Sequence, residues 1–209
     1  MMDLSERQWL KHAVTHISDG FEDMRWKKAG SLAAAFIIVG MLFLGEIAYS
    51  RLFGMQFYVS QDKLFSVVPF IMRSFVLFAV WTVGNWAVCT LLDGEGTMRN
   101  ICIYSAYALV PYVAQLWIRV LLSHILIADE MVFMEVIKLI GTGWTVILLF
   151  SAVKSVHQYT FGKTAVAICL TLAAMLIMLV LLILFMSLVQ QVWIFISAVF
   201  TEVTYRVKV

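Results

Sequence analysis

Two short polar segments interrupt an otherwise apolar chain, and they hold most of the residues that could carry out chemistry. The first is "DGEGT" at residues 93–97, and the second is "VKSVHQYTFGKT" at residues 153–164. Carboxylates beside glycines are typical of cation sites or tight turns, and histidine, tyrosine and lysine can donate protons or bind anions. With the residues around a proline between these segments, the candidates are Asp93, Gly94, Glu95, Gly96, Thr97, Tyr107, Pro111, Tyr112, Lys154, His157, Tyr159, Gly162 and Lys163.

Neither segment matches a known cofactor or metal motif. The first segment lacks the alternating oxygen ligands and the distal glutamate of an EF-hand. Gly162-Lys163-Thr164 resembles the end of a nucleotide-binding P-loop, but His157 stands where that motif requires its first glycine. The chain also has no H-E-x-x-H and no G-x-S-x-G motif. We therefore expect no cofactor, no metal and no enzymatic activity; an enzyme acting on lipid is only the third alternative.

The same residues are good turn formers. Gly94 can end one helix in the left-handed conformation, and Thr97 can cap the start of the next. The alternatives are thus a plain helix hairpin, or a hairpin that also binds a cation or a basic partner segment. Because the two segments carry opposite charges, we expect them to be in contact. The expected partners of Asp93 or Glu95 are Lys154, His157 and Lys163.

The composition predicts a membrane protein. The chain has 209 residues, of which 63% are hydrophobic and 13% charged, and its mean hydropathy is +0.94. Soluble domains are about 25% charged, so lipid must be the solvent for most of this surface. The net charge of +2 makes nucleic acid a poor partner. The cysteines lie in or beside apolar runs and are interpreted as packing thiols: Cys89, Cys102 and Cys169.

Five apolar stretches are long enough to cross a bilayer, since a spanning helix needs about 20 residues. They are residues 29–49, 65–92, 101–122, 133–156 and 164–189. The sequence therefore predicts an all-α, polytopic fold with five transmembrane helices in a bundle. We divide it into an amphipathic N-terminal segment (1–28), a membrane domain (29–190) and a C-terminal interfacial segment with the tail (191–209).

Two further features concern the ends of the chain. A helix from residue 164 to 200 would be roughly 55 Å long at 1.5 Å per residue, so we expect a bend or an interfacial segment after Gln190 and Gln191. Near the N-terminus, Leu10, Ala13, Val14, Ile17 and Phe21 follow helical spacing. That helix either lies on the membrane surface, with Trp9 and Trp26 as anchors, or packs on the bundle.

The distribution of basic residues predicts the orientation. The N-terminal segment and the loops with the polar segments hold eight Lys and Arg residues, against four in the opposite loops and the tail. Basic residues stay in the cytoplasm. We therefore expect a cytoplasmic N-terminus, an outside C-terminus and both polar segments facing the cytoplasm, in a multi-pass protein of the cell (plasma) membrane.

Polar residues also lie inside the apolar stretches: Glu46, Arg73, Asn85, Arg119, Glu135 and Lys138. Such residues are either functional or, near a helix end, long enough to reach the interface. Glu135 and Lys138 are three residues apart and can pair. Pro111 should kink its helix and leave a polar notch at Tyr104, Ser105 and Tyr107.

Three ordered motifs resemble the Yip domain family, the Ypt/Rab-interacting membrane proteins. Bacterial members show D-G-x-G-T, Y-A-x-x-P-Y and H-x-Y-x-x-G-K, which match "DGEGT", "YALVPY" and "HQYTFGK" here. The resemblance covers about residues 20–190, including "DGFEDMRWKKAGS" before the first span. It implies a five-span bundle with a cytoplasmic N-terminus. Eukaryotic relatives are implicated in vesicle traffic and in binding prenylated small GTPases. This chain, with only two prolines, resembles the short bacterial branch, often regarded as accessory to transport.

These observations favour a non-enzymatic integral membrane protein that organises membrane or docks a partner through its cytoplasmic hairpins. The alternative is a transporter or an accessory subunit of a transport system, with the notch and the charged outer ends as its path. The expected partners are the lipid bilayer and a membrane or cytoplasmic protein; a homo-oligomer is left open.

Overall fold

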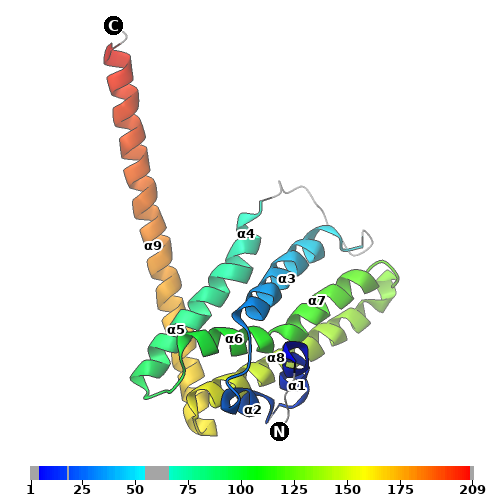
Figure 1. Cartoon of the computed structure of the whole chain (residues 1–209). Coiled ribbons are helices and arrows are strands. Elements are labelled where there is room, and N and C mark those ends of the chain that lie inside the picture. The colour runs from blue at the N-terminus through cyan, green and yellow to red at the C-terminus, as the bar shows by residue number, and fades with distance from the viewer. Residues whose placement is uncertain (1–4, 18, 55–65, 208–209) are drawn as a thin grey trace.

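The described part of the computed structural model, residues 5–17, 19–54 and 66–207, consists of helices joined by turns and short loops (Figure 1). In chain order they are α1 (Glu6–Thr15), α2 (Gly20–Trp26), α3 (Leu32–Arg51), α4 (Val68–Ile71), the π-helical turn η2 (Met72–Val76), α5 (Leu77–Leu91), α6 (Met98–Ala108), α7 (Val110–Leu122), the 3-10 turn η3 (Ala128–Glu130), α8 (Met131–His157) and α9 (Phe161–Val207).

The predicted all-α class and the five membrane-spanning helices are confirmed. Five helical segments are long and apolar enough to span a bilayer: Leu32–Arg51, Val68–Leu91, Met98–Leu122, Met131–His157 and Phe161–Thr204. The second span combines α4, η2 and α5, and the third combines α6 and α7. The protein is therefore a polytopic membrane protein; its orientation in the membrane stays a prediction.

The turn between α5 and α6 differs from the prediction in one detail. Thr97 caps α6 as expected, since its side chain accepts a hydrogen bond from the backbone N–H of Asn100 at 3.3 Å. The left-handed residue, however, is Asp93, with a φ of 56°, and not Gly94. Aspartate tolerates this conformation better than most residues. Gly94 is needed for a different reason, since a side chain at this position would not fit.

Pro111 interrupts the third span as predicted. α6 ends at Ala108, and α7 begins at Val110 with the proline in its first turn, because proline lacks an N–H and crowds the preceding helical turn. The expected polar notch is not open at its tyrosines. Tyr104 and Tyr107 are 2% and 0% exposed, within a core where α6 packs against α3, α8 and α1.

The N-terminal helices pack on the bundle, which favours the second of the two alternatives for this segment. Trp9 is only 8% exposed and belongs to the core, so it is not a headgroup anchor. From α8, the indole of Trp144 donates to the carbonyl of Val14 at 3.1 Å, and Ser151 donates to the carbonyl of Ile17. Trp26 is 80% exposed.

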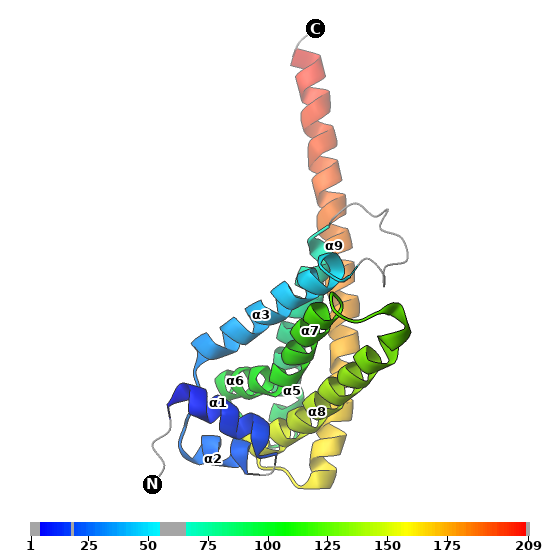
Figure 2. The same ribbon diagram turned by 90° about the vertical axis from the view of Figure 1, so that its right-hand side faces the viewer.

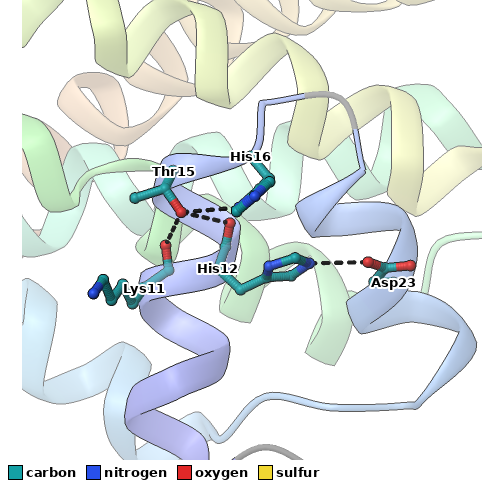
Figure 3. A network of polar contacts seen from close by, with 5 residues as sticks. All are labelled: Lys11, His12, Thr15, His16 and Asp23. Carbon is teal, nitrogen blue, oxygen red and sulfur yellow. Dashed lines mark hydrogen bonds and ion pairs between the residues drawn. The ribbon is translucent and has the colours of Figure 1, made fainter. Parts of the chain in front are cut away.

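An imidazole on α1 also holds α1 to α2. His12 Nε2 lies 2.9 Å from the carboxylate of Asp23, and Figure 3 shows this pair across the two helices. Thr15 hydrogen-bonds at 2.8 Å to the carbonyl of Lys11, and its hydroxyl also lies 3.0 Å from the His16 ring. The two short helices therefore form one unit seated on α6 and α8.

α9 is longer than any bilayer requires. It continues without interruption through Gln190 and Gln191, so the expected break in the helix is absent. The reason is local: residues 163–207 contain neither Pro nor Gly. Only the first part of α9 is covered, mainly by α5, and the rest extends away from the bundle in both views (Figures 1 and 2). An interfacial position for residues 191–209 stays a prediction.

Candidate functional site

The two polar segments lie side by side at one end of the bundle. We call this the hairpin end: the α5–α6 turn (residues 92–97), the α8–α9 turn (residues 158–160) and α2 beside them. In Figure 1 these turns and both short N-terminal helices occupy the same end of the bundle. The predicted contact between the two segments is confirmed by the hydrogen bonds described next.

His157, at the end of α8, contacts the α5–α6 turn through one ring nitrogen and α5 through the other. Its Nδ1 accepts a hydrogen bond from the backbone N–H of Gly96 at 3.3 Å, and its Nε2 lies 3.1 Å from Asn85 Oδ1. Because an amide oxygen accepts only, this arrangement requires a neutral ring with its proton on Nε2. Asn85 then donates to Thr171 Oγ1 of α9 at 3.3 Å. His157 is 2% exposed, and Asn85 and Thr171 are fully buried, so one network joins α5, the α5–α6 turn, α8 and α9.

Tyr159 closes the end of α5. Its hydroxyl donates to the carbonyls of Cys89 at 3.0 Å and Leu92 at 3.2 Å, in the last turn and at the C-cap of α5. Its ring stacks on His157 with a centroid separation of 5.3 Å. Burial raises the pKa of the Tyr159 phenol above its ordinary value, so the hydroxyl remains a donor.

Two of the three motif glycines are required by contact. A Cβ at Gly94 would lie 2.5 Å from both His157 Nδ1 and Tyr159 Oη, and one at Gly96 would lie 2.5 Å from His157 Cε1. Both distances are far inside van der Waals contact. Gly162, in contrast, has open space where a Cβ would stand. The absence of side chains at Gly94 and Gly96 therefore allows the rings of His157 and Tyr159 to approach the backbone of the α5–α6 turn.

The ion pairs differ from those predicted. Glu95 pairs with Arg25 of α2, whose guanidinium also donates to the carbonyl of Ser155 at 3.2 Å. Lys154 lies 3.9 Å from Glu22, again on α2. Among the described residues, no ion pair joins the two turns directly. The acidic residues of the first segment, Asp93 and Glu95, were expected near Lys154, His157 or Lys163. Instead, α2 supplies the counter-charge both to Glu95 and to Lys154.

Lys163 and Asp93 remain at the rim. Lys163 Nζ lies 4.5 Å from the centroid of the Tyr159 ring, a cation–π contact. Asp93 is exposed beside it. Lys163 therefore covers the Tyr159 ring from outside.

The middle motif does not reach the hairpin end. Tyr107 is buried and accepts a hydrogen bond from the backbone N–H of Ser31 at 3.4 Å. Tyr112, just after Pro111, donates to Glu46 at 3.3 Å, toward the other end of the bundle. Conversely, sequence reasoning missed the part that Arg25 and Thr171 play. A signal existed only for Asn85, an amide in the middle of an apolar run.

The arrangement at the hairpin end is suited to holding helices together and presenting a surface. The buried polar groups of His157, Asn85 and Tyr159 are used in contacts within the chain, and no cluster of three metal-ligating side chains occurs in the described ranges. What remains outside is a mixed surface of exposed aromatic, aliphatic and charged side chains: Trp26, Lys27, Lys28, Leu91, Asp93, Glu95, Arg99, Phe161 and Lys163.

A comparison with protein families shows a match over most of the chain. The family model described as the Yip1 domain matches residues 11–201, nearly the whole chain. No curated protein and no solved structure matches the chain.

Proposed function

The chain belongs to the Yip1 domain family, and on this basis we propose that it is a non-enzymatic membrane protein that docks a partner or organises membrane through its hairpin end. The family consists of membrane proteins that interact with Rab GTPases and are not known as enzymes. The distribution of Lys and Arg favours a cytoplasmic hairpin end, and we propose the cell membrane as the location of the protein.

The observation that carries this proposal is the separation of roles at the hairpin end. Buried polar side chains fix the two turns from within, and the exposed residues Trp26, Leu91 and Phe161 take no part in that hydrogen-bond network. A surface that is held rigid loses little conformational entropy when a partner binds. Trp26, Leu91 and Phe161 are 80%, 85% and 73% exposed beside charged residues, a mixture that is typical of interface cores with polar rims.

The first test is photocrosslinking in native membranes. A photoreactive amino acid at Thr160 or Arg99, one exposed position on each hairpin, should give a discrete protein adduct that mass spectrometry identifies. The matched control is Asp129, which is exposed near the opposite end of α8. The adduct should weaken several-fold when Lys27 and Lys28 are both changed to Glu. Adducts to lipid or to the chain itself alone, or equal adducts from Asp129, would refute docking at the hairpin end.

The second candidate is a transporter or an accessory subunit of a transport system. Two cavities in the other half of the bundle favour it, with Glu46, Arg73 and Arg119 in their walls. Purified protein in liposomes would then move a solute, and Arg119→Gln would abolish the flux. Under the docking proposal, the purified chain moves none.

A further inference from the structure

A charged cavity opens at the end of the bundle opposite to the hairpins. It measures about 440 Å³ and lies between the end of α3, α4 with η2, the end of α7 and the start of α8. Its lining includes Glu46, Arg73, Arg119 and Glu135. We call it the outer cavity. Two cations and two carboxylates in its wall give no net charge.

An apolar cavity lies directly next to it, and we call it the inner cavity. It measures about 530 Å³ and shares the side chains of Glu46 and Arg73 with the outer cavity. The rest of its wall is mainly apolar and comes from α3, α5, α6 and α8, with Leu77, Phe78 and Leu149 as examples. The sizes of both fall within the range of small-molecule sites, about 300–1,000 Å³.

Each cavity has in its wall a buried polar atom without a partner. In the inner cavity it is Oγ of Ser74, a residue that is 0% exposed. In the outer cavity it is Nε of Arg119, a residue that is 5% exposed. A buried polar group without a hydrogen bond lowers the free energy of unfolding by about 1–3 kcal/mol. A ligand that bonds these two atoms would remove this loss.

The backbone around Ser74 explains why its hydroxyl has no partner in the chain. A serine inside an α-helix commonly bonds the carbonyl four residues earlier. Ser74 lies instead in the π-helical turn η2, Met72–Val76. Such turns interrupt α-helices frequently at functional sites. Leu109, at the break between α6 and α7, also lines the inner cavity.

The charged side chains of the outer cavity are already held in place. Arg119 does not extend to the interface as a surface anchor; its Nη2 donates to Tyr49 at 2.9 Å and lies 3.5 Å from Glu135. Glu135 also takes the predicted pair with Lys138 at 3.0 Å. Arg73 and Glu46 are 3.8 Å apart. Because the charges balance, a zwitterionic group fits here better than a multiply anionic one.

We propose that the two cavities together bind one phospholipid with a zwitterionic headgroup. The headgroup occupies the outer cavity, where a phosphate oxygen accepts a hydrogen bond from Nε of Arg119. The hydroxyl of Ser74 donates to an ester carbonyl at the passage between the cavities. One acyl chain fills the inner cavity. The polar atoms therefore follow the order of the lipid itself: charged head, ester, hydrocarbon.

The test uses the full chain in nanodiscs with a diazirine-labelled phosphatidylethanolamine as the probe. We expect the probe to label peptides of the cavity walls, within residues 68–82 and 105–119. Leu77→Trp, which fills the inner cavity from a residue that is 39% exposed, should reduce labelling at least fivefold. The matched control is Ile71→Trp, on the same span, 41% exposed and outside both walls; it should change labelling less than twofold.

Three results would overturn the proposal. Equal labelling in the two tryptophan variants would mean ordinary surrounding lipid. Equal labelling by a diazirine fatty acid, which has no phosphate, would remove the role of the headgroup. Competition by inorganic phosphate would make free phosphate the ligand. If Leu77→Trp fails to fold, Ser74→Ala replaces it, with an expected several-fold loss of labelling. The hairpin crosslinks from Thr160 and Arg99 are read separately, so either proposal can fail alone.

Discussion

The two ends of the bundle use polar residues in opposite ways. At the hairpin end, His157, Asn85 and Tyr159 are buried and hydrogen-bonded to other parts of the chain. At the cavity end, Ser74 and Arg119 are equally buried, yet each has an atom without a partner. A closed network fixes backbone positions and leaves function to the surface outside it, whereas an incomplete one beside a cavity has room for a ligand. We therefore propose partner docking for the hairpin end and ligand binding for the cavity end.

The largest effect is expected from breaking the closed network at its centre. His157→Phe keeps an aromatic ring but removes both nitrogens, so Asn85 Oδ1 and the N–H of Gly96 lose their partners. At about 1–3 kcal/mol for each of the two unsatisfied groups, the loss is roughly 2–6 kcal/mol. The melting temperature in detergent should fall clearly, and the photocrosslinks from Thr160 should weaken with it.

The control for this change is His124→Phe, at an exposed histidine near the end of α7. It should shift the melting temperature only slightly, since surface substitutions usually stay within about 0.5 kcal/mol. Equal shifts for the two variants would mean that the buried network does not hold the hairpin end together.

A second, smaller effect separates the motif glycines. Gly94→Ala introduces a methyl group 2.5 Å from His157 Nδ1 and Tyr159 Oη, and overpacking of this kind costs about 1–3 kcal/mol. Gly162→Ala meets open space in the first turn of α9, where alanine is the better helix former by up to about 1 kcal/mol. Thermal unfolding in detergent should therefore move in opposite directions. Destabilisation by both would show that Gly162 has a contact of its own.

Much of the fold was predictable because membrane spans are long and local. The five spans, the cap at Thr97 and the break at Pro111 follow from residues that are near one another in sequence. The partner of Glu95 could not be predicted in this way, because Arg25 is 70 positions away and nothing in either segment indicates that α2 lies beside it. The sequence analysis predicted a break in α9 because the helix is longer than a bilayer is thick. Bilayer thickness, however, sets only the length of helix that lipid can cover, and it does not end a helix.

At the cavity end, too, only some of the site residues could be predicted from the sequence. Arg119, Glu46 and Arg73 were identified as candidates from their charge within apolar runs, which needs no structure. The orphan hydroxyl of Ser74 has no sequence signal, since serine is common in membrane helices and the π-helical turn depends on packing against α3. Local sequence patterns thus predict the helices and the candidate residues, whereas long-range packing determines which candidate residues are in contact.

Charge reversal of the Arg25–Glu95 pair tests whether α2 stabilises the hairpin end. Glu95 is 67% exposed at its side chain, so the pair should contribute at most about 1 kcal/mol. Glu95→Arg alone should lower the melting temperature slightly, and Arg25→Glu with Glu95→Arg should restore most of the loss. Restoration by Lys163→Glu instead of Arg25→Glu would return the pairing to the two turns and contradict the position of α2.

The smallest effect on stability is expected at the cavity end, and it sharpens the comparison most. Ser74→Ala removes a buried hydroxyl that has no partner in the chain, so in detergent without added lipid the change should be within about 0.5 kcal/mol of neutral or stabilising. Ser105→Ala is the matched control. That serine is 3% exposed, lines the same inner cavity and accepts a hydrogen bond from the Trp81 indole at 3.0 Å. Its loss leaves the indole N–H unpaired and should cost about 1–3 kcal/mol. Adding phosphatidylethanolamine should then raise the melting temperature of Ser105→Ala more than that of Ser74→Ala, because only the former keeps the hydroxyl that bonds the lipid ester. An equal rise in both variants would leave the Ser74 hydroxyl without a ligand and would end the distinction between the two ends of the bundle.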